Sequence, residues 1–365
     1  MFKYIFLFIV FIHGLIHFMG FAKAFNYGNI TQLTKAISRP AGILWLFTAL
    51  LFLVTVLMVL LKSERWPYLA VFAVLLSQVL ICSVWKDAKF GSIANMLILL
   101  AAIAAWGNLQ FESGFRNDVK ENLSLQKITD DGILKEADIL ALPQPVQKYL
   151  RFTGAVNKPA VHNVRISFSG EMRGKGQGWF AFQSVQYDFI KYPARLFFMK
   201  AKMFGVAVPG YHDYKKGAAA MNIKLFGLYP LVSAKGPEMN KSEAVTFFND
   251  ICLFAPAMLI DKRIQWDTID SVSAKAIFDD GTNKIAATLF FNGEGQLLNF
   301  ISDDRYAISE MKQFRFSTPV RDYKVINGRR IPTYGETTWH YPESDFIYGK
   351  FNLTSIEYNV NEYAQ

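Results

Sequence analysis

Two histidines in the first apolar segment are the residues of this sequence best placed for chemistry. His13 and His17 are four residues apart, so they share one face of a helix. Ionisable side chains inside a bilayer are costly and usually face the interior of a helix bundle. Ser77, Gln78 and Asn95 fall at a similar depth in two later apolar segments. We therefore predict an intramembrane polar cluster formed by these five residues.

Three roles are open for this polar cluster. The histidines could ligate a metal or haem, relay protons, or hydrogen-bond the neighbouring helices. A metal or haem site needs further strong ligands, and the apolar segments contain no third histidine. We therefore predict no bound metal or cofactor. Handling of a metal, haem or protons by His13 and His17 stays an alternative function.

The rest of the chain offers polar candidates but no recognised catalytic motif. The candidates are His212-Asp213, the run Asp303-Asp304-Arg305, and Glu336 with His340. On a strand, a spacing of four residues separates Glu336 from His340 by about 13 Å, which is too far for direct acid–base pairing. The run 303–305 is more typical of a salt-bridged turn. No catalytic residue is predicted, and a hydrolase-like enzyme at the membrane surface stays a second alternative.

Four apolar segments must position the histidine cluster. A bilayer core requires about 20 apolar residues per helix, and segments 2–21, 42–61, 67–85 and 93–109 meet or approach this length. Charged breaks separate them, and tryptophans lie at or near their ends, where amphipathic rings prefer the headgroup layer. We predict a four-span transmembrane region over residues 1–111.

Lysine and arginine in the short loops predict the orientation. The first and third loops carry five basic residues: Lys23, Lys35, Arg39, Lys86 and Lys89. The opposite side carries three before the soluble domain begins: Lys3, Lys62 and Arg65. The first and third loops are therefore expected in the cytoplasm. This predicts a multi-pass protein of the bacterial inner membrane whose soluble domain is extracytoplasmic.

Charge and cysteine content exclude two classes of protein. The formal net charge of +9 divides into +5 in the first 115 residues and +4 in the remainder. A nucleic-acid binder concentrates its basic residues on one face, so no nucleic-acid partner is predicted. Cys82 lies in an apolar segment and Cys252 outside one, with no C-x-x-C motif. Thiol redox sites and zinc ribbons are therefore excluded.

The remaining two-thirds of the chain predicts an α+β domain. A linker with some helix is expected over residues 112–140, and a soluble domain over 141–365. Residues 142–152 fit a short amphipathic helix, and residues 164–171 and 179–190 alternate like strands. Turn sequences follow at 173–178, 279–283, 292–295 and 327–328. A long helix is expected over 243–259, starting at a capping box formed by Asn240 and Glu243. We predict a large curved antiparallel sheet packed against this helix.

Three motifs resemble those of an uncharacterised bacterial membrane family. They are His13-Gly-Leu-Ile-His17, Phe254-Ala-Pro-Ala-Met-Leu259 followed by Trp266, and Ile331-Pro-Thr-Tyr-Gly-Glu-Thr-Thr-Trp-His340. The resemblance implies a multi-helix N-terminal region joined to a β-rich domain of unknown function. It implies no catalytic residue, because the family has no established activity. By architecture alone, the β domain also resembles the lipoprotein-carrier fold, in which a curved sheet wraps helices around an apolar cavity.

Aromatic residues predict an apolar groove in the soluble domain. Adjacent residues on a strand point to opposite faces, so Phe197-Phe198 and Phe290-Phe291 place apolar surface on both faces of the sheet. Packing within an ordinary core is the alternative. The predicted groove consists of Phe197, Phe198, Phe248, Phe254, Phe290 and Phe291. The function predicted is a membrane-anchored binding module for an apolar ligand, most simply a lipid, with the bilayer as its other partner.

Overall fold

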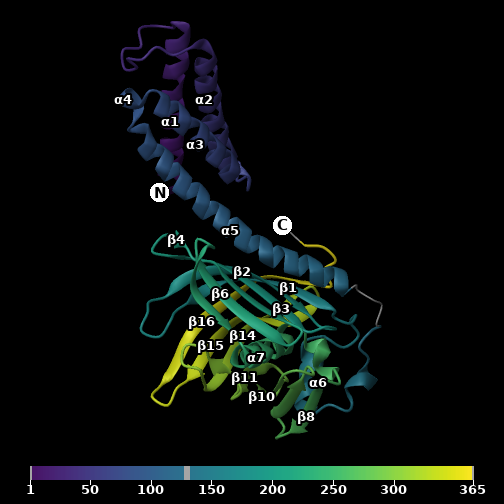
Figure 1. Ribbon diagram of the computed structural model, residues 1–365. Coiled ribbons are helices and arrows are strands. Elements are labelled where there is room, and N and C mark those ends of the chain that lie inside the picture. Colours follow the sequence, from purple (N-terminus) through teal and green to yellow (C-terminus); the bar gives the residue numbers. More distant parts are fainter. Residues whose placement is uncertain (1, 127–131, 364–365) are drawn as a thin grey trace. The chain divides into compact units, whose positions relative to one another are not determined.

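The computed structural model describes residues 2–126 and 132–363 and divides the chain into two compact units, Met1–Phe111 and Glu112–Gln365 (Figure 1). The helices that begin in the first unit are α1 (Phe2–Phe25), α2 (Arg39–Leu60), α3 (Trp66–Ser83), the short α4 (Trp85–Ala88) and α5 (Gly91–Leu125). Among the described residues, α1, α2, α3 and α5 are long and apolar enough to cross a membrane. The prediction of four long apolar helices is confirmed.

Small residues bring α1 and α2 into close contact. A Cβ atom at Gly20 would lie 2.1 Å from the Trp45 ring, and one at Gly42 would lie 2.3 Å from the Cβ of Ala24. Both distances are far below van der Waals contact, so these two helices can only approach this closely with glycine at each position. Small residues play this role in helix packing within membranes.

The second unit begins inside α5 and contains the β-rich part of the chain. Before the sheet lie the 3-10 turn η1 (Glu136–Ile139) and α6 (Gln144–Phe152). The first strands are β1 (Asn163–Met172), β2 (Phe180–Phe189), β3 (Ala194–Met203), β4 (Val206–Ala207), β5 (Gly210–Lys215), β6 (Ala218–Leu225) and β7 (Tyr229–Lys235). The later strands are β8 (Ile264–Thr268), β9 (Ser273–Asp279), β10 (Lys284–Phe291), β11 (Leu297–Ser302), β12 (Tyr306–Ala307), β13 (Lys312–Gln313), β14 (Arg315–Ile326), β15 (Arg329–His340) and β16 (Asp345–Tyr358).

The stretch 112–140, where a linker was expected, begins with the last turns of α5 and ends at η1, while residues 127–131 lie outside the described part of the chain. The ring of Phe115 on α5 lies 5.3 Å from that of Phe198 and 5.6 Å from that of Tyr211. These contacts are all within the second unit. The C-terminal turns of α5 therefore cover the outer face of the sheet at β3 and β5.

One antiparallel sheet contains most of the strands of the second unit. Its order is β7-β6-β5-β3-β2-β1-β16-β15-β14-β11-β10-β9-β8, with β4 paired to β3. The pairing of β1 with β16 joins the first strand of the unit to its last. The expected turn sequences connect hairpins: residues 173–178 join β1 to β2, and Asn327 and Gly328, with φ values of 51° and 72°, join β14 to β15. Two successive residues at positive φ match the turn that two-residue hairpins favour.

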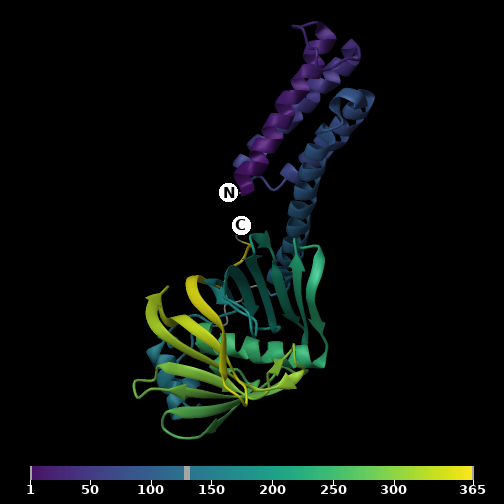
Figure 2. The ribbon, with the colours of Figure 1, turned by 90° about the vertical axis from the view of Figure 1, so that its left-hand side faces the viewer.

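The sheet curves around α7 (Pro237–Phe254), as Figure 2 shows. Thirteen of the eighteen residues of this helix are buried, so sheet and loops enclose nearly its whole circumference. Tyr149 and Tyr358 donate hydrogen bonds to the carbonyl groups of Cys252 and Phe254 at its C-terminal end, at 2.7 and 2.9 Å. The predicted fold, four apolar helices followed by a large antiparallel sheet packed against a helix, is confirmed.

The start of this helix differs from the expected one. Helix α7 begins at Pro237 after Gly236, and a second segment, η2 (Pro256–Ile260), follows a break at Ala255. The expected capping box is absent because both its side chains have other partners. Asn240 Oδ1 accepts the backbone N–H of Ala219 at 2.7 Å, and Glu243 binds side chains of the sheet. Proline at the first helical position begins the helix instead.

Two turns from opposite parts of the sheet meet and hold the curvature. The turn between β5 and β6 contains Gly217, whose carbonyl accepts a hydrogen bond from Asn283 Nδ2 at 2.8 Å. Asn283 lies in the turn between β9 and β10, and the hydroxyl of Tyr214 donates to Asp280 in the same turn. Strands β5 and β10 are far apart in the order of the sheet. The sheet must therefore bend strongly for these turns to touch.

Candidate functional site

A cavity of about 780 Å³ lies between the concave face of the sheet and α7. Small-molecule sites typically measure about 300–1,000 Å³. The apolar part of the lining includes Phe168, Met199, Met221, Leu253, Val320 and Phe351. Leu231 and Val232 of the edge strand β7 both line the cavity and are partly exposed, at 49% and 38%. The cavity therefore has an apolar border that is accessible from outside.

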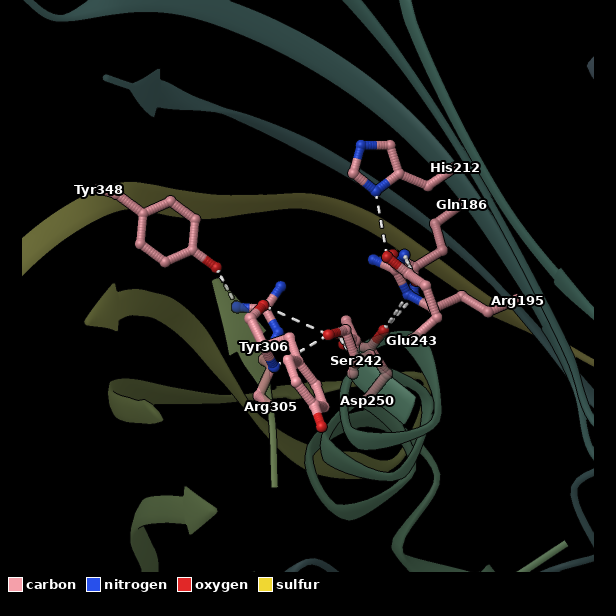
Figure 3. A network of polar contacts seen from close by, with 10 residues as sticks. Gln186, Arg195, His212, Ser242, Glu243, Asp250, Arg305, Tyr306 and Tyr348 are labelled. Atoms are coloured by element: carbon pink, nitrogen blue, oxygen red, sulfur yellow. Dashed lines mark hydrogen bonds and ion pairs between the residues drawn. The ribbon is translucent and has the colours of Figure 1, made fainter. Parts of the chain in front are cut away.

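A buried ionic network forms part of the cavity wall (Figure 3). Arg195 of β3 donates from Nε to Asp250 Oδ2 at 2.7 Å and from Nη1 to Glu243 Oε2 at 3.0 Å. Its Nη2 donates to Gln186 Oε1 at 3.0 Å. His212 Nδ1 lies 3.1 Å from Glu243 Oε1. Glu243 and Asp250 are two turns apart on one face of α7, so the network joins the helix to β2, β3 and β5.

Burial and charge divide the carboxyl groups of this network into two kinds. Burial alone would raise the pKa of Glu243, but Arg195 and His212 outweigh it and lower that pKa to about 2. Burial raises the pKa of Asp250, and Arg195 offsets only part of this effect. Burial and the nearby Asp250 raise the pKa of Asp188 well above its ordinary value. Glu243 is therefore the carboxylate that stays ionised most readily.

A second arginine of the cavity wall has aromatic neighbours instead of carboxylates. The guanidinium of Arg305 lies 4.2 Å from the ring centroid of Phe316, 5.0 Å from that of Trp339 and 5.8 Å from that of Tyr348. Its Nη1 donates to the hydroxyl of Tyr348 at 2.5 Å. These distances fit cation–π contacts.

The run 303–305 forms a turn in which the two aspartates, but not the arginine, are ion-paired. Asp303 binds Arg315 at 2.9 Å, and Asp304 binds Lys241 at 2.8 Å. The expected salt-bridged turn is thus formed with partners from distant segments. Arg305 instead contacts the aromatic rings of the cavity wall.

Two of the six aromatic residues predicted for the groove line the cavity, and four do not. Phe197 and Phe254 line it. The other four lie elsewhere: Phe248 stacks on Phe278 in the core, Phe291 packs against Tyr149, Phe198 faces Phe115, and Phe290 is 39% exposed. The alternation of the strands explains the split of the pair 197–198, since only one face of β3 is concave.

Four residues of the polar wall were not predicted as site residues, namely Gln186, Arg195, Glu243 and Asp250, and Arg305 was a candidate only as part of the run 303–305. Their partners come from strands and a helix that are distant in the sequence. One signal was available in the sequence: Glu243 and Asp250 have apolar neighbours in α7, and both are buried in the structure. A charged residue that is buried requires a buried partner.

In the first unit, the structure brings the five predicted polar residues into one hydrogen-bonded cluster. His13 Nε2 lies 2.9 Å from Asn95 Oδ1 and 3.2 Å from Ser77 Oγ. His17 Nε2 lies 2.9 Å from the same hydroxyl, and its Nδ1 lies 2.8 Å from the carbonyl oxygen of His13. Asn95 Nδ2 donates to Gln78 Oε1 at 3.0 Å. The cluster links α1, α3 and α5.

These contacts favour a hydrogen-bonding role for the histidines. Because Nδ1 of His17 faces a carbonyl, it carries the proton, and Nε2 accepts the hydroxyl proton of Ser77. His13 Nε2 then donates to Asn95. Both imidazole rings therefore take part in hydrogen bonds that link α1 to α3 or α5. Among the described residues, no group of three or more His, Cys, Asp or Glu is arranged to hold a metal.

Ser317, His340 and Asp345 form a hydrogen-bonded series across β14, β15 and β16. Ser317 Oγ lies 2.8 Å from His340 Nε2, and His340 Nδ1 lies 2.6 Å from Asp345 Oδ1. The order of the three residues matches a serine-protease triad. In such a triad the serine is accessible to substrate and the aspartate is buried, whereas here the serine is the buried residue. Ser317 is only 3% exposed, while the side chain of Asp345 is 68% exposed. A carbonyl substrate has no access to this hydroxyl, so the series is a link between strands.

The other predicted polar residues are also placed. His212 lines the cavity as part of the ionic network. Glu336 accepts a hydrogen bond from the hydroxyl of Tyr334 at 2.7 Å and has no contact with His340. The two residues do not form an acid–base pair, as their spacing on a strand indicated.

Comparison with known proteins gives a family and two distant structural relatives. A model of a family of unknown function, DUF6544, matches residues 132–351. None of the curated proteins matches the chain. Solved structures with some similarity include a DUF1329 family protein from Desulfovibrio piger, with 10% identity, a TM-score of 0.37, and coverage of 60% of this chain and 95% of the other.

A LolA superfamily protein from Nitrosomonas europaea has 10% identity and a TM-score of 0.31, with coverage of 63% of this chain and 93% of the other. Similarity at this level carries no functional inference. The family match covers more than half of the chain and includes the cavity wall from Phe168 to Phe351. The chain therefore belongs to DUF6544, a family of unknown function.

Proposed function

We propose that this protein is a membrane-anchored module that binds an apolar ligand, a lipid, in the cavity between the curved sheet and α7. The main observation in support of this proposal is the cavity of about 780 Å³, whose lining is largely apolar and aromatic. A fully packed core leaves few voids larger than a water molecule. An interior space of this size is therefore better explained by a ligand than by imperfect packing.

Two further features support a lipid. The partly exposed Leu231 and Val232 offer an apolar entry at the edge strand β7. The four long apolar helices support anchoring in a bilayer, where such a ligand is abundant. We propose a multi-pass protein of the inner membrane with its second unit on the extracytoplasmic side. The domains proposed are a transmembrane region over 1–111, a linker over 112–140 and a binding domain over 141–365.

Filling the cavity tests this function. Thr246 of α7 lines the cavity, so Thr246→Phe should occupy the ligand space without overpacking the core. We expect the full-length variant to keep its thermal stability but to lose bound lipid. The measurement is native mass spectrometry after gentle extraction, together with binding of a fluorescent lipid.

Ala255→Phe is the matched control. Ala255 is 2% exposed and lies outside the cavity lining, so the added ring must overpack the core, which typically costs about 1–3 kcal/mol. This control should lose thermal stability and retain lipid below its unfolding temperature. Wild-type protein that carries no lipid and binds none, or Thr246→Phe that binds lipid normally, would contradict the proposal.

A further inference from the structure

Arg305 differs from the other arginine of the cavity wall in how its donors are used. A guanidinium has five N–H donors. Arg195 donates from Nε, Nη1 and Nη2 to side chains of the network. Arg305 donates to the hydroxyl of Tyr348, while its Nε–H is buried and has no hydrogen-bond partner. Arg305 therefore has donors left for a further acceptor.

The carboxylates around Arg305 are already neutralised by other cations. Asp303 and Asp304, which precede it in the chain, bind Arg315 and Lys241. Glu243, on the facing helix, binds Arg195 and His212 (Figure 3). Within the described part of the chain, no carboxylate lies within salt-bridge distance of Arg305. Its positive charge therefore has no ion-pair partner in the wall of the cavity, and Glu243 interacts with it only at longer range.

The aromatic cage of Arg305 holds the cation but does not neutralise it. The rings of Phe316, Trp339 and Tyr348 keep the guanidinium partly out of water, and all three line the same cavity. A partly dehydrated cation is stabilised when an anion pairs with it. Charge-assisted hydrogen bonds from arginine to carboxylate or phosphate are among the strongest in proteins.

Asn249 gives a second, independent sign that the occupant has a polar part. It lies on α7 and lines the cavity, and it is only 4% exposed. Its Nδ2 donates to Thr318 Oγ1 at 3.0 Å, whereas its Oδ1 has no hydrogen-bond partner. Leaving a buried amide oxygen unpaired costs about 1–3 kcal/mol. A hydroxyl or water at the polar end of a ligand would pair with it.

We propose that the cavity binds an anionic amphiphile whose carboxylate or phosphate head pairs with Arg305. The apolar chain then lies along the lining that includes Met199, Met221 and Leu253. This inference rests on the proposed lipid-binding function and adds the chemical class of the head group. Arg305 acts as a binding residue, and Phe316 and Trp339 position its guanidinium.

Photo-crosslinking of the full-length protein in nanodiscs tests this assignment. The probes are a diazirine-bearing palmitic acid, a diazirine-bearing lysophosphatidic acid and the neutral fatty alcohol of the same chain. Labelled peptides are identified by mass spectrometry. In wild-type protein, at least one anionic probe should label peptides that contain Met199, Met221 or Leu253, along which its chain is proposed to lie. Whether the fatty acid or the phosphate probe labels more strongly identifies the head group.

Substitutions then separate the head-group contact from the cavity itself. Arg305→Gln should reduce labelling by the anionic probe about tenfold or more, which is the loss expected for one charge-assisted hydrogen bond. Labelling by the neutral alcohol should not change. Arg315→Gln removes an arginine whose side chain is 58% exposed and bound to Asp303, so it should leave all labelling unchanged.

The possible failures of the two proposals are distinguishable. If no probe labels the cavity in wild-type protein, the lipid-binding function itself is wrong. If the alcohol and the acid label Arg305→Gln as well as wild type, the cavity binds lipid but the head-group assignment is overturned. Should Arg305→Gln unfold, Arg305→Lys decides: retention of charge should preserve preferential labelling by the anionic probe, and loss of that preference would contradict an ionic contact.

Discussion

Three buried carboxyl groups, Asp188, Glu243 and Asp250, interact with the guanidinium of Arg195. One cation cannot neutralise three anions. The raised pKa values of Asp188 and Asp250 and the lowered pKa of Glu243 express this competition. Gln186 Nε2 donates to Asp188 Oδ2 at 2.7 Å, but Asp188 Oδ1 has no hydrogen-bond partner. Asp188 is therefore the least compensated of the three.

Asp188→Asn should stabilise the protein above neutral pH. The folded-state pKa of Asp188 is raised by burial and by Asp250, so the folded state holds a proton that the unfolded state has released. Stability therefore falls as pH rises above the ordinary aspartate pKa toward the raised one. Asparagine removes this loss and keeps an acceptor for Gln186. Thermal unfolding of the wild type and the variant between pH 5 and 9, at about unit intervals, measures the difference.

Glu243→Gln is the matched comparison and should act in the opposite direction. Its folded-state pKa is lowered to about 2, with Arg195 and His212 outweighing burial. Glu243 thus contributes stability that is fully present above its ordinary pKa and is lost as pH falls from that pKa toward about 2. The glutamine variant should be less stable than wild type at neutral pH. If both substitutions changed thermal stability in the same direction, the assignment of Glu243 as the ionised carboxylate and Asp188 as the protonated one would be contradicted.

At the scale of elements, the curvature of the sheet depends on contacts between turns. Gly217 has a φ of 75° in the turn between β5 and β6, and an added Cβ would lie 2.5 Å from Thr282 in the turn between β9 and β10. The hydrogen bond from Asn283 to the Gly217 carbonyl joins the same two turns. This contact therefore connects β5 and β10, which are far apart in the order of the sheet.

Gly217→Ala should separate these turns. Both the positive φ and the clash with Thr282 oppose a side chain, so we expect a loss of about 2–4 kcal/mol in the free energy of unfolding, more than backbone strain alone produces. Gly281→Ala is the control, because its φ of 90° is equally unfavourable but its Cβ would meet nothing within 4 Å. Chemical denaturation should show the larger loss for Gly217→Ala. Equal losses would mean that the contact does not hold the sheet.

At the scale of the whole molecule, the chain combines four apolar helices with a β-rich unit that contains a cavity. If the helices span the inner membrane as proposed, reporter fusions after Lys23, Lys62, Lys86 and Arg116 should alternate between compartments. The loop charges predict that the reporter after Arg116 is extracytoplasmic. A cytoplasmic signal there would reverse the proposed orientation, and failure to alternate would contradict the four-span topology.

Local physics explains what could be predicted from the sequence alone. The apolar helices follow from segment length and composition, and the hairpins follow from turns such as Asn327-Gly328, where the residues themselves favour positive φ. The polar cluster also has a local origin, because His13 and His17 share one helix face and Ser77 and Asn95 lie at matching depth. These features depend on neighbouring residues or on simple distances along a helix.

Only the tertiary structure decided where the cavity lies and which charges remain free within it. Which of Phe197 and Phe198 points into the cavity depends on the direction in which the sheet curves. That direction depends on strand pairings such as β1 with β16. Arg195 and Arg305 are the same residue type, and of the two it is Arg305 that directly follows a pair of aspartates in the sequence. Their difference arises because α7 brings Glu243 and Asp250 to Arg195, while Arg305 faces aromatic rings. Partners of this kind are set by contacts between distant segments, which no local pattern encodes.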